Sequence, residues 1–310
     1  MILLLILVAI VLVSSFGTVL YLRPKRASEV ELSNYQIHNE VPSLFRIFDG
    51  TKIHYNQLGQ GPDLVFLHGI GASTFIWRQL LPILAKNFRV TAIDMPGFGR
   101  SQKSLDFHFD LDSMADFVAK FLTDLGVEKF DLVGSSMGGS IALWIAKKNR
   151  ARCSRVLTIA PATNKSLIRY PPLGLKVMKP LHFLVNKRTM FVAVANVVKR
   201  RDLLTDAMIE GYLLPFRDKG EAWQSFLKAT AIVGDHRMPA ELAELNSRPE
   251  FQHKIIWGDD DRVVPRRVQD ELLKVLPRSE FEVLKGLGHH PFEDDPDKIS
   301  LIIQNFFTRP

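Results

Sequence analysis

The sequence predicts an α/β fold, in which a mostly parallel sheet carries helices on both faces. Short apolar runs alternate with longer stretches of helical period along most of the chain, and this alternation is typical of βαβ units. The chain has 310 residues, enough for one large domain with an insertion. Residues 161–246 interrupt the alternation, and so long a connection needs structure of its own.

The elements can be assigned in chain order. Residues 44–48 and 52–57 predict an opening hairpin around Asp49 and Gly50. The remaining apolar runs predict further strands at 63–67, 89–93, 130–134, 155–159, 253–257 and 281–284. Helical patterns cover 75–86, 111–125, 139–148 and 297–307. We therefore expect a core made of residues 44–160 and 247–310, with residues 161–246 inserted after the sixth strand.

The N-terminal segment carries a separate pattern. Residues 2–22 hold no charged side chain and are dominated by Leu, Ile and Val, which is enough to span about 30 Å of hydrocarbon as a helix. A signal peptide needs a positive region before its apolar stretch, and a core helix needs a polar face, but this segment has neither. Small residues at Ser14, Ser15 and Gly17 leave a cleaved signal peptide open as an alternative. We expect residues 1–22 to form a transmembrane anchor.

The flanking charges predict how this anchor is oriented. Arg23, Lys25 and Arg26 follow the apolar span directly, and positive charge collects on the cytoplasmic side of a membrane segment. We therefore expect a single-pass membrane protein whose large domain lies on the cytoplasmic side. A single cysteine, Cys153, excludes an internal disulfide and fits a reducing compartment. Residues 23–43 are polar and patternless, so we interpret them as a stalk.

The stretch Gly134-Ser135-Ser136-Met137-Gly138 lies between a predicted strand and a predicted helix. In that context G-x-S-x-G is typical of a nucleophile elbow, a turn so sharp that the central serine takes a strained backbone conformation. Small residues two positions before and after the serine let the strand and helix approach closely. Ser136 would then present its hydroxyl above the sheet, beside the amide groups that begin a helix. Taken alone, the motif could also be a glycine turn with an uninvolved serine.

Candidate partners for this serine follow later in the chain, each after a predicted strand. Three consecutive acids follow the strand at 253–257, and two consecutive histidines follow the strand at 281–284. Serine is a poor nucleophile at neutral pH, so an imidazole must take its proton and a carboxylate must orient that imidazole. The order Ser, Asp, His is the one that an elbow serine requires. Position alone leaves Asp259, Asp260 and Asp261 open as the acid, and His289 and His290 as the base.

Five separated motifs resemble the α/β-hydrolase superfamily, from about residue 45 to the C-terminus. They are His68-Gly69, the turn Asp94-Met95-Pro96-Gly97-Phe98-Gly99-Arg100-Ser101, the elbow Gly134 to Gly139, Trp257-Gly258-Asp259-Asp260-Asp261, and Gly288-His289. The resemblance implies an α/β-hydrolase fold with an eight-stranded sheet, and it makes residues 161–246 the helical cap over the active site. A serine rather than an aspartate at the elbow implies the serine hydrolase branch.

The resemblance also implies a role for each site residue. Ser136 would be the nucleophile, Asp261 the acid and His289 the base. The backbone N–H groups of Ile70 and Met137 would bind the oxyanion. Loss of one such donor typically costs about 3 kcal/mol of transition-state stabilisation.

Two further residues are expected to be structural, and no cofactor is expected. By the resemblance, His68 shapes its loop and Asp94 belongs to a turn. The sequence has no H-E-x-x-H and only one cysteine, so it predicts no metal site. The pair Gly97 and Gly99 has no third glycine and no following helix pattern, so a bound nucleotide is not predicted either.

The predicted cap carries concentrated positive charge. From Pro161 to Arg201 there are nine Lys or Arg residues and no Asp or Glu, whereas the whole chain has a net charge of +7. Apolar residues such as Phe183 and Phe191 lie between them. This pattern predicts contact with an anionic membrane, to which each basic residue contributes about 1 kcal/mol; a solvated lid with inward-packed apolar residues is the alternative. Without a recognisable nucleic-acid module, we expect no nucleic-acid partner.

The anchor, the serine elbow and the basic apolar cap together resemble membrane-anchored monoacylglycerol lipases. This resemblance implies a carboxylic ester hydrolase that acts on a lipid ester through an acyl-enzyme. C–C bond hydrolases of ring-cleavage products share a similar G-x-S-M-G-G and the same triad, and they are the first alternative, although they are usually soluble. A non-catalytic hydrolase-like binding module is the second. Acyl chain length and oligomeric state are not predicted.

Overall fold

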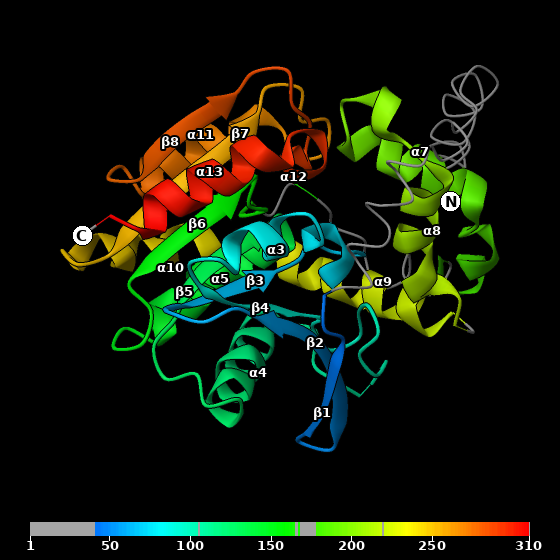
Figure 1. Cartoon of the computed structure of the whole chain (residues 1–310), viewed down its shortest axis with the longest axis horizontal. Coiled ribbons are helices and arrows are strands. Elements are labelled where there is room, and N and C mark those ends of the chain that lie inside the picture. The colour runs from blue at the N-terminus through cyan, green and yellow to red at the C-terminus, as the bar shows by residue number, and fades with distance from the viewer. Residues whose placement is uncertain (1–40, 105, 165–166, 168–177, 219, 310) are drawn as a thin grey trace.

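The computed structural model describes residues 41–309 except 105, 165–166, 168–177 and 219, and it contains one eight-stranded sheet (Figure 1). The strand order is β1-β2-β4-β3-β5-β6-β7-β8. The bounds are β1 Leu44–Phe48, β2 Thr51–Leu58, β3 Asp63–Leu67, β4 Arg89–Ile93, β5 Asp131–Ser135, β6 Arg155–Ile159, β7 Gln252–Gly258 and β8 Glu280–Leu284. β2 pairs antiparallel with β1 and β4, and all other neighbours are parallel. The predicted mostly parallel sheet is confirmed.

Helices cover both faces of this sheet, and each face has its own apolar core. The helices of the core are α3 Leu80–Leu84, α4 Leu111–Asp124, α5 Met137–Lys148, α11 Arg266–Val275, α12 Pro291–Asp294 and α13 Pro296–Phe307. Buried residues of α4, α5 and α11 form one cluster with the sheet, and those of α3 and α13 form the other. β3 serves both clusters: Val65 and Leu67 belong to the first, Leu64 and Phe66 to the second. This alternation is the period of two that a strand buried on both faces requires.

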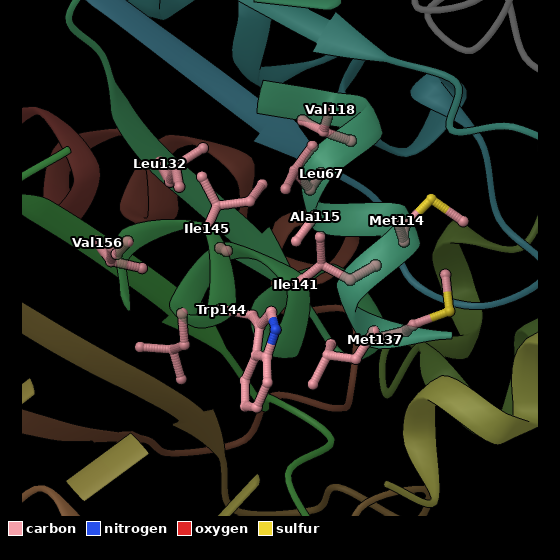
Figure 2. Close-up of a cluster of buried hydrophobic side chains, with 14 of the residues drawn as sticks. Leu67, Met114, Ala115, Val118, Leu132, Met137, Ile141, Trp144, Ile145 and Val156 are labelled. Carbon is pink, nitrogen blue, oxygen red and sulfur yellow. The ribbon is translucent and has the colours of Figure 1, made fainter. Parts of the chain in front are cut away.

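Helices α4 and α5 pack against the strands that carry the site. Figure 2 shows Met114, Ala115 and Val118 of α4 facing Ile141 and Ile145 of α5, with Leu67 of β3 beside the α4 residues and side chains of β5 and β6 to the left. Because α5 begins directly after the elbow, this packing fixes the start of the helix relative to the sheet.

The predicted helix over residues 75–86 is wrong in its extent. The segment forms a 3₁₀ turn, η1 (Thr74–Trp77), and then the short helix α3. A continuous helix would need the N–H of Pro82 to bond the carbonyl of Arg78, and proline has no N–H. Proline is tolerated in the first turn of a helix, which is where α3 places Pro82.

The long segment between β6 and β7 is helical in its described part. It holds η2 Lys179–Leu184, α7 Lys187–Val197, η3 Arg201–Leu203, α8 Asp206–Leu213, η4 Leu214–Phe216, α9 Glu221–Val233, α10 Met238–Leu242 and η5 Ala243–Ser247. Asn186 and Thr189 form a capping box at the start of α7. Helices α7, α8 and α9 lie at one end of the sheet (Figure 1). The described part of this insertion thus consists of short helices and 3₁₀ turns.

The predicted anchor, residues 1–22, and nearly all of the predicted stalk lie outside the described residues. In the part of the chain that the structure describes, no helix combines the length and the hydropathy that crossing a bilayer requires. The anchor therefore stays a prediction from the sequence.

Candidate active site

The elbow serine has the strained backbone that the motif predicts. Ser136 has φ 53° and ψ −118°, a positive φ that non-glycine residues rarely adopt. Its N–H donates to the carbonyl of Ile159 at 2.9 Å, and its carbonyl accepts from the N–H groups of Gly139 at 3.0 Å and Ala162 at 3.1 Å. Bonds to the end of β6 with its following loop, and to the first turn of α5, thus hold the conformation, as stored strain requires.

Glycine is needed on both sides of this serine because the backbone is crowded. A Cβ on Gly134 would lie 2.3 Å from the carbonyl oxygen of Gly138. A Cβ on Gly138 would lie 2.2 Å from the carbonyl oxygen of Leu67. Strand β5, helix α5 and the end of β3 can therefore approach closely only without side chains at these positions.

Asp261 and His289 come together from loops after different strands. The Nδ1 of His289 lies 2.7 Å from Oδ2 of Asp261, and the two side chains are only 3% and 2% exposed. The other oxygen of Asp261 accepts from the N–H groups of Val263 at 2.8 Å and Val264 at 2.9 Å. The carboxylate is thus fixed at both oxygens, and it orients the imidazole.

Asp259 and Asp260, which position alone also allowed as the acid of the triad, have other partners. Asp259 accepts from the N–H of Gly286 at 2.8 Å. Asp260 pairs with Lys199 of the cap and with Arg262. Among the interactions recorded for the described residues, neither acid bonds to His289. The structure therefore brings Asp261, the residue that the motif indicated, to the histidine.

His290, the alternative base, lies in a different hydrogen-bond network. Its Nδ1 lies 3.0 Å from the hydroxyl of Tyr212. Burial, with His289 beside it, lowers the pKa of His290 well below its usual range, so the ring is neutral. The structure thus separates the two histidines that position alone could not.

Ser136 and His289 line one cavity of about 380 Å³ beneath the cap, a size suited to a small-molecule ligand. Its described lining residues are Gly69, Ile70, Gly71, Ala72, Ser136, Met178, Leu181, Leu184, Val185, Thr189, Met190, Ala193, Val194, Val197, Tyr212, Phe216, Trp223, Phe226, Val263, His289 and His290. No hydrogen bond joins Ser136 to His289 among the bonds of the described residues. Such bonds are often long before substrate binds.

The two predicted oxyanion amides flank the serine. A Cβ on Gly69 would lie 3.2 Å from the Cβ of Ser136, so the loop that continues into Ile70 runs beside the serine. Met137 is the first residue of α5, where an N–H has no partner within its helix. Within the described residues, no hydrogen bond is recorded from either amide. Both are therefore available to a ligand oxygen.

His68 and Asp94 hold the surrounding loops, as expected from the sequence. The Nδ1 of His68 donates to the carbonyl of Gly69 at 2.7 Å, while its Nε2 accepts from the N–H of Met95 at 3.2 Å. Burial lowers the pKa of His68, which is consistent with a neutral ring that donates at one nitrogen and accepts at the other. Asp94 accepts from the N–H groups of Thr74 at 2.6 Å and Arg100 at 2.7 Å.

One buried network at the site was not predicted from the sequence. Glu293 accepts from both terminal nitrogens of Arg78, at 2.6 and 2.8 Å, and from the hydroxyl of Tyr212 at 2.9 Å. These residues come from three distant segments, and no local motif marks any of them. The one feature of the sequence that could have pointed to this network is that Glu293 lies four residues after His289, the predicted base.

Among the described residues, no group of His, Cys, Asp and Glu side chains has the arrangement of a metal site. The expectation that the protein binds neither a metal nor a nucleotide cofactor stays a prediction from the sequence.

Comparison with known proteins identifies the family. The sequence profile of the alpha/beta hydrolase family matches residues 64–300. The uncharacterized hydrolase YugF of Bacillus subtilis is 32% identical over 270 residues, covering 83% of this chain and 95% of that protein. The 2-hydroxy-6-oxononadienedioate/2-hydroxy-6-oxononatrienedioate hydrolase of Escherichia coli is 26% identical, covering 84% of this chain and 92% of its own.

Solved structures agree on the fold. The crystal structure of a membrane phospholipase A superposes with a TM-score of 0.71 at 21% identity, covering 99% of this chain and 95% of that chain. At this identity the likeness concerns the fold alone. Together with the profile and the sequence relatives, it leads to one conclusion: the chain belongs to the alpha/beta hydrolase family.

Proposed function

We propose that this hydrolase cleaves carboxylic esters of lipids, in the manner of a monoacylglycerol lipase. The observation that carries the proposal is the cavity itself. Ser136 and His289 lie at a cavity whose other described lining residues are mostly apolar. An acyl chain would bury its methylene groups there, and each buried methylene contributes about 0.8 kcal/mol to binding.

The proposed reaction follows acyl transfer to serine and then to water. Ser136 Oγ attacks the ester carbonyl carbon while His289 Nε2 takes the hydroxyl proton. The N–H groups of Ile70 and Met137 donate to the oxyanion, and Asp261 stabilises the imidazolium. His289 then gives its proton to the leaving alcohol. The same imidazole deprotonates a water molecule, which attacks the acyl-enzyme, and it returns this proton to Ser136 Oγ as the fatty acid leaves.

A C–C bond hydrolase is the second candidate, favoured by the Escherichia coli relative. The name of that relative specifies a dioate substrate, which carries two carboxylates. A carboxylate is costly to bury unless a cation or several donors pair with it. No Lys or Arg is among the described residues that line the cavity. This composition supports an uncharged ester over a dicarboxylate, and we retain the ester as the first candidate.

Membrane association is the third part of the proposal, and it rests on the predicted anchor and on the cap. Phe183 of η2 is 66% exposed and lies in the same 3₁₀ turn as Leu181 and Leu184, which line the cavity. Lys179, the first residue of this turn, and Arg188, four residues after its end, are both exposed. An exposed aromatic ring between cations suits the interface of an anionic bilayer. A lipid ester would enter the cavity from that side.

A chain-length series tests the proposed function. p-Nitrophenyl esters from acetyl to palmitoyl are given to the full-length protein in liposomes containing phosphatidylglycerol. The same esters are given to a truncated protein that begins at Glu31, and each protein is compared with its Ser136→Ala variant. We expect hydrolysis that depends on Ser136 and rises for longer chains in liposomes.

The controls separate the candidates. A vinylogous diketone dicarboxylate is assayed beside the esters. Turnover of that compound without ester turnover would replace the ester proposal with C–C hydrolysis. No turnover of either, together with no reaction toward a fluorophosphonate, would indicate the binding module.

A further inference from the structure

A buried network joins the cap to the loop that carries His289. Tyr212 of α8 contacts both Glu293 and His290, through its hydroxyl, at 2.9 and 3.0 Å. Glu293 is bound in turn by Arg78, and Gln79 donates to its Oε2 at 3.2 Å. The side chains of Arg78 and Glu293 are 8% and 1% exposed. The network is therefore part of the interior.

The direction of each proton in this network can be worked out. Glu293 faces a guanidinium, so it is a carboxylate that only accepts hydrogen bonds. The single hydroxyl proton of Tyr212 is donated to Glu293, which leaves the phenol oxygen only as an acceptor toward His290. His290 must then carry its proton on Nδ1. Because burial keeps this ring neutral, its Nε2 holds a lone pair and no proton.

This lone pair is open to the cavity. His290 lines the cavity, and the rings of His289 and Phe292 stack against it at 5.3 and 4.9 Å between centroids. Buried polar side-chain atoms without a partner, among the described residues, are Trp77 Nε1, Ser135 Oγ, Ser225 Oγ and Ser300 Oγ. Within the described residues, His290 Nε2 has no recorded partner either, and it is not one of these enclosed atoms. Since the ring lines the cavity, we infer that Nε2 faces it.

The other polar side chains that line the cavity already donate hydrogen bonds within the protein or take part in the proposed reaction. Thr189 donates its hydroxyl to the carbonyl of Leu184 at 2.6 Å. Trp223 donates its indole N–H to the carbonyl of Met178 at 2.8 Å. Ser136 and His289 belong to the proposed reaction. Among the described lining residues, His290 thus offers a neutral acceptor that neither the fold nor the proposed chemistry employs.

We propose that His290 Nε2 selects substrates whose alcohol portion carries a free hydroxyl group. The substrate class is then a partly acylated polyol, such as a monoacylglycerol, rather than a simple alkyl ester. This inference rests on the proposed ester hydrolysis. The free hydroxyl of the substrate would donate to Nε2 of His290, next to His289. The acyl chain would then lie along the apolar wall of the cavity. The leaving alcohol would lie near His289, which gives it a proton.

The size of the expected preference follows from the cost of leaving Nε2 of His290 without a hydrogen bond. A bound alkyl ester would displace water from Nε2 without replacing its hydrogen bond, whereas a polyol ester would replace it. A neutral hydrogen bond contributes about 1 kcal/mol, and about 1.4 kcal/mol corresponds to tenfold. We expect kcat/KM to favour 1-decanoylglycerol over propyl decanoate, which has the same acyl chain and carbon count in the alcohol, by about fivefold.

The test compares this ratio across variants of the full-length protein. His290→Phe keeps a stacking ring and removes the acceptor, and we expect the ratio to fall to about one. Tyr212→Phe removes the group that fixes the tautomer, and we expect an intermediate ratio. His236→Phe makes the same replacement at an exposed histidine, and it should keep the wild-type ratio.

A spectroscopic measurement tests the tautomer without relying on variants. ¹⁵N NMR of His290 in the wild-type protein should show a protonated Nδ1 and an unprotonated Nε2, and the proton should lose this preference in Tyr212→Phe. A protonated Nε2 in the wild type would overturn the proposal, and so would equal kcat/KM for the two esters. Turnover of neither ester would instead contradict the proposed function.

Discussion

Asp261 holds His289 with one carboxylate oxygen, and its other oxygen is held by the amides of Val263 and Val264. The imidazole therefore keeps its proton on Nδ1, and its Nε2 is the atom that can take the proton of Ser136. Asp260, one residue away, is occupied by Lys199 and Arg262 instead. Neighbouring carboxylates thus have different environments, and this difference can be tested.

We predict that Asp261→Asn lowers kcat by about 10⁴, because the amide favours the wrong imidazole tautomer. The KM should change little, since Asp261 is not among the described residues that line the cavity. Asp260→Asn is the matched control and should keep kcat within about twofold, because an exposed ion pair contributes little. Steady-state kinetics with p-nitrophenyl butyrate measure both. Equal losses in the two variants would contradict the assignment of Asp261.

A second residue-scale prediction concerns acid stability. His253 is buried between the hydroxyls of Thr158 at 2.9 Å and Ser279 at 2.8 Å, and burial lowers its pKa from 6.5 to about 3. The unfolded chain binds a proton below about pH 6.5, whereas the folded chain does not. The stability contributed by the neutral ring is therefore present above that pH and is lost as the pH falls toward about 3.

Urea unfolding at several pH values between about 7 and about 5 measures this effect, which can reach about 1.4 kcal/mol per pH unit. His253→Gln should show a correspondingly shallower decline of the unfolding free energy. The other buried histidines are unchanged in the variant, so the difference isolates His253. Parallel pH profiles for the two proteins would refute the explanation.

Residues of the site differ in how well the sequence predicts them. Ser136, Asp261 and His289 each follow a strand in a short motif, so local pattern is enough to find them. Tyr212 has no such motif, because its role depends on packing a cap helix against a loop 78 residues away in the chain. Tertiary contacts of this kind leave no periodic signal in the sequence.

At the scale of elements, the elbow depends on a close approach between backbones. We predict that Gly138→Ala destabilises the fold by about 3 kcal/mol, because its Cβ would lie 2.2 Å from the carbonyl oxygen of Leu67. Gly126 differs from Gly138 in having a positive φ, of 73°, and nothing lies within 4 Å of its Cβ position. Gly126→Ala should therefore cost only about 1 kcal/mol from backbone strain.

Urea denaturation compares the two glycine variants, and ester hydrolysis is measured on whatever fraction of each remains folded. Gly138→Ala should also lose activity, since the turn that presents Ser136 must shift. If Gly126→Ala proved the more destabilising of the two, steric crowding would not be the reason for glycine in the elbow.

The sequence predicts the strands more accurately than the helices. Every predicted strand is present, because buried strands are continuous apolar runs between turn residues. Helix α11 was not predicted, although Val268 and Leu272 are spaced by four and both are buried. Charged residues fill half of that helix, so its apolar stripe is narrow and gives a weak signal. The break before α3 depends on Pro82 rather than on the apolar pattern.

At the scale of the whole molecule, the cap is less positively charged than its sequence suggests. Lys187 pairs with Asp206 and Glu210, which follow the basic segment in the chain. Lys199 pairs with Asp260 of the core. Counting charge along the chain cannot reveal such pairs, since acids from other segments supply them. The proposed membrane face therefore depends on the basic residues around η2 more than on the total count.

The same cap brings apolar side chains to the carboxyl ends of the parallel strands. Gly69 follows β3, Ser136 follows β5 and His289 follows β8, and all three line one cavity with residues of α7. Ligands of open parallel sheets bind at this edge. The cap and the strand ends thus place an apolar cavity directly above the residues proposed to react.

The central claim is that Ser136 is an activated nucleophile, and a fluorophosphonate with an alkyl chain tests it most directly. Mass spectrometry of the digested protein should find the phosphonyl adduct on Ser136. Ser135→Ala, which removes the neighbouring hydroxyl, should still be labelled, whereas Ser136→Ala should not. An adduct that persists in Ser136→Ala, or wild-type protein that remains unlabelled while folded, would contradict the account.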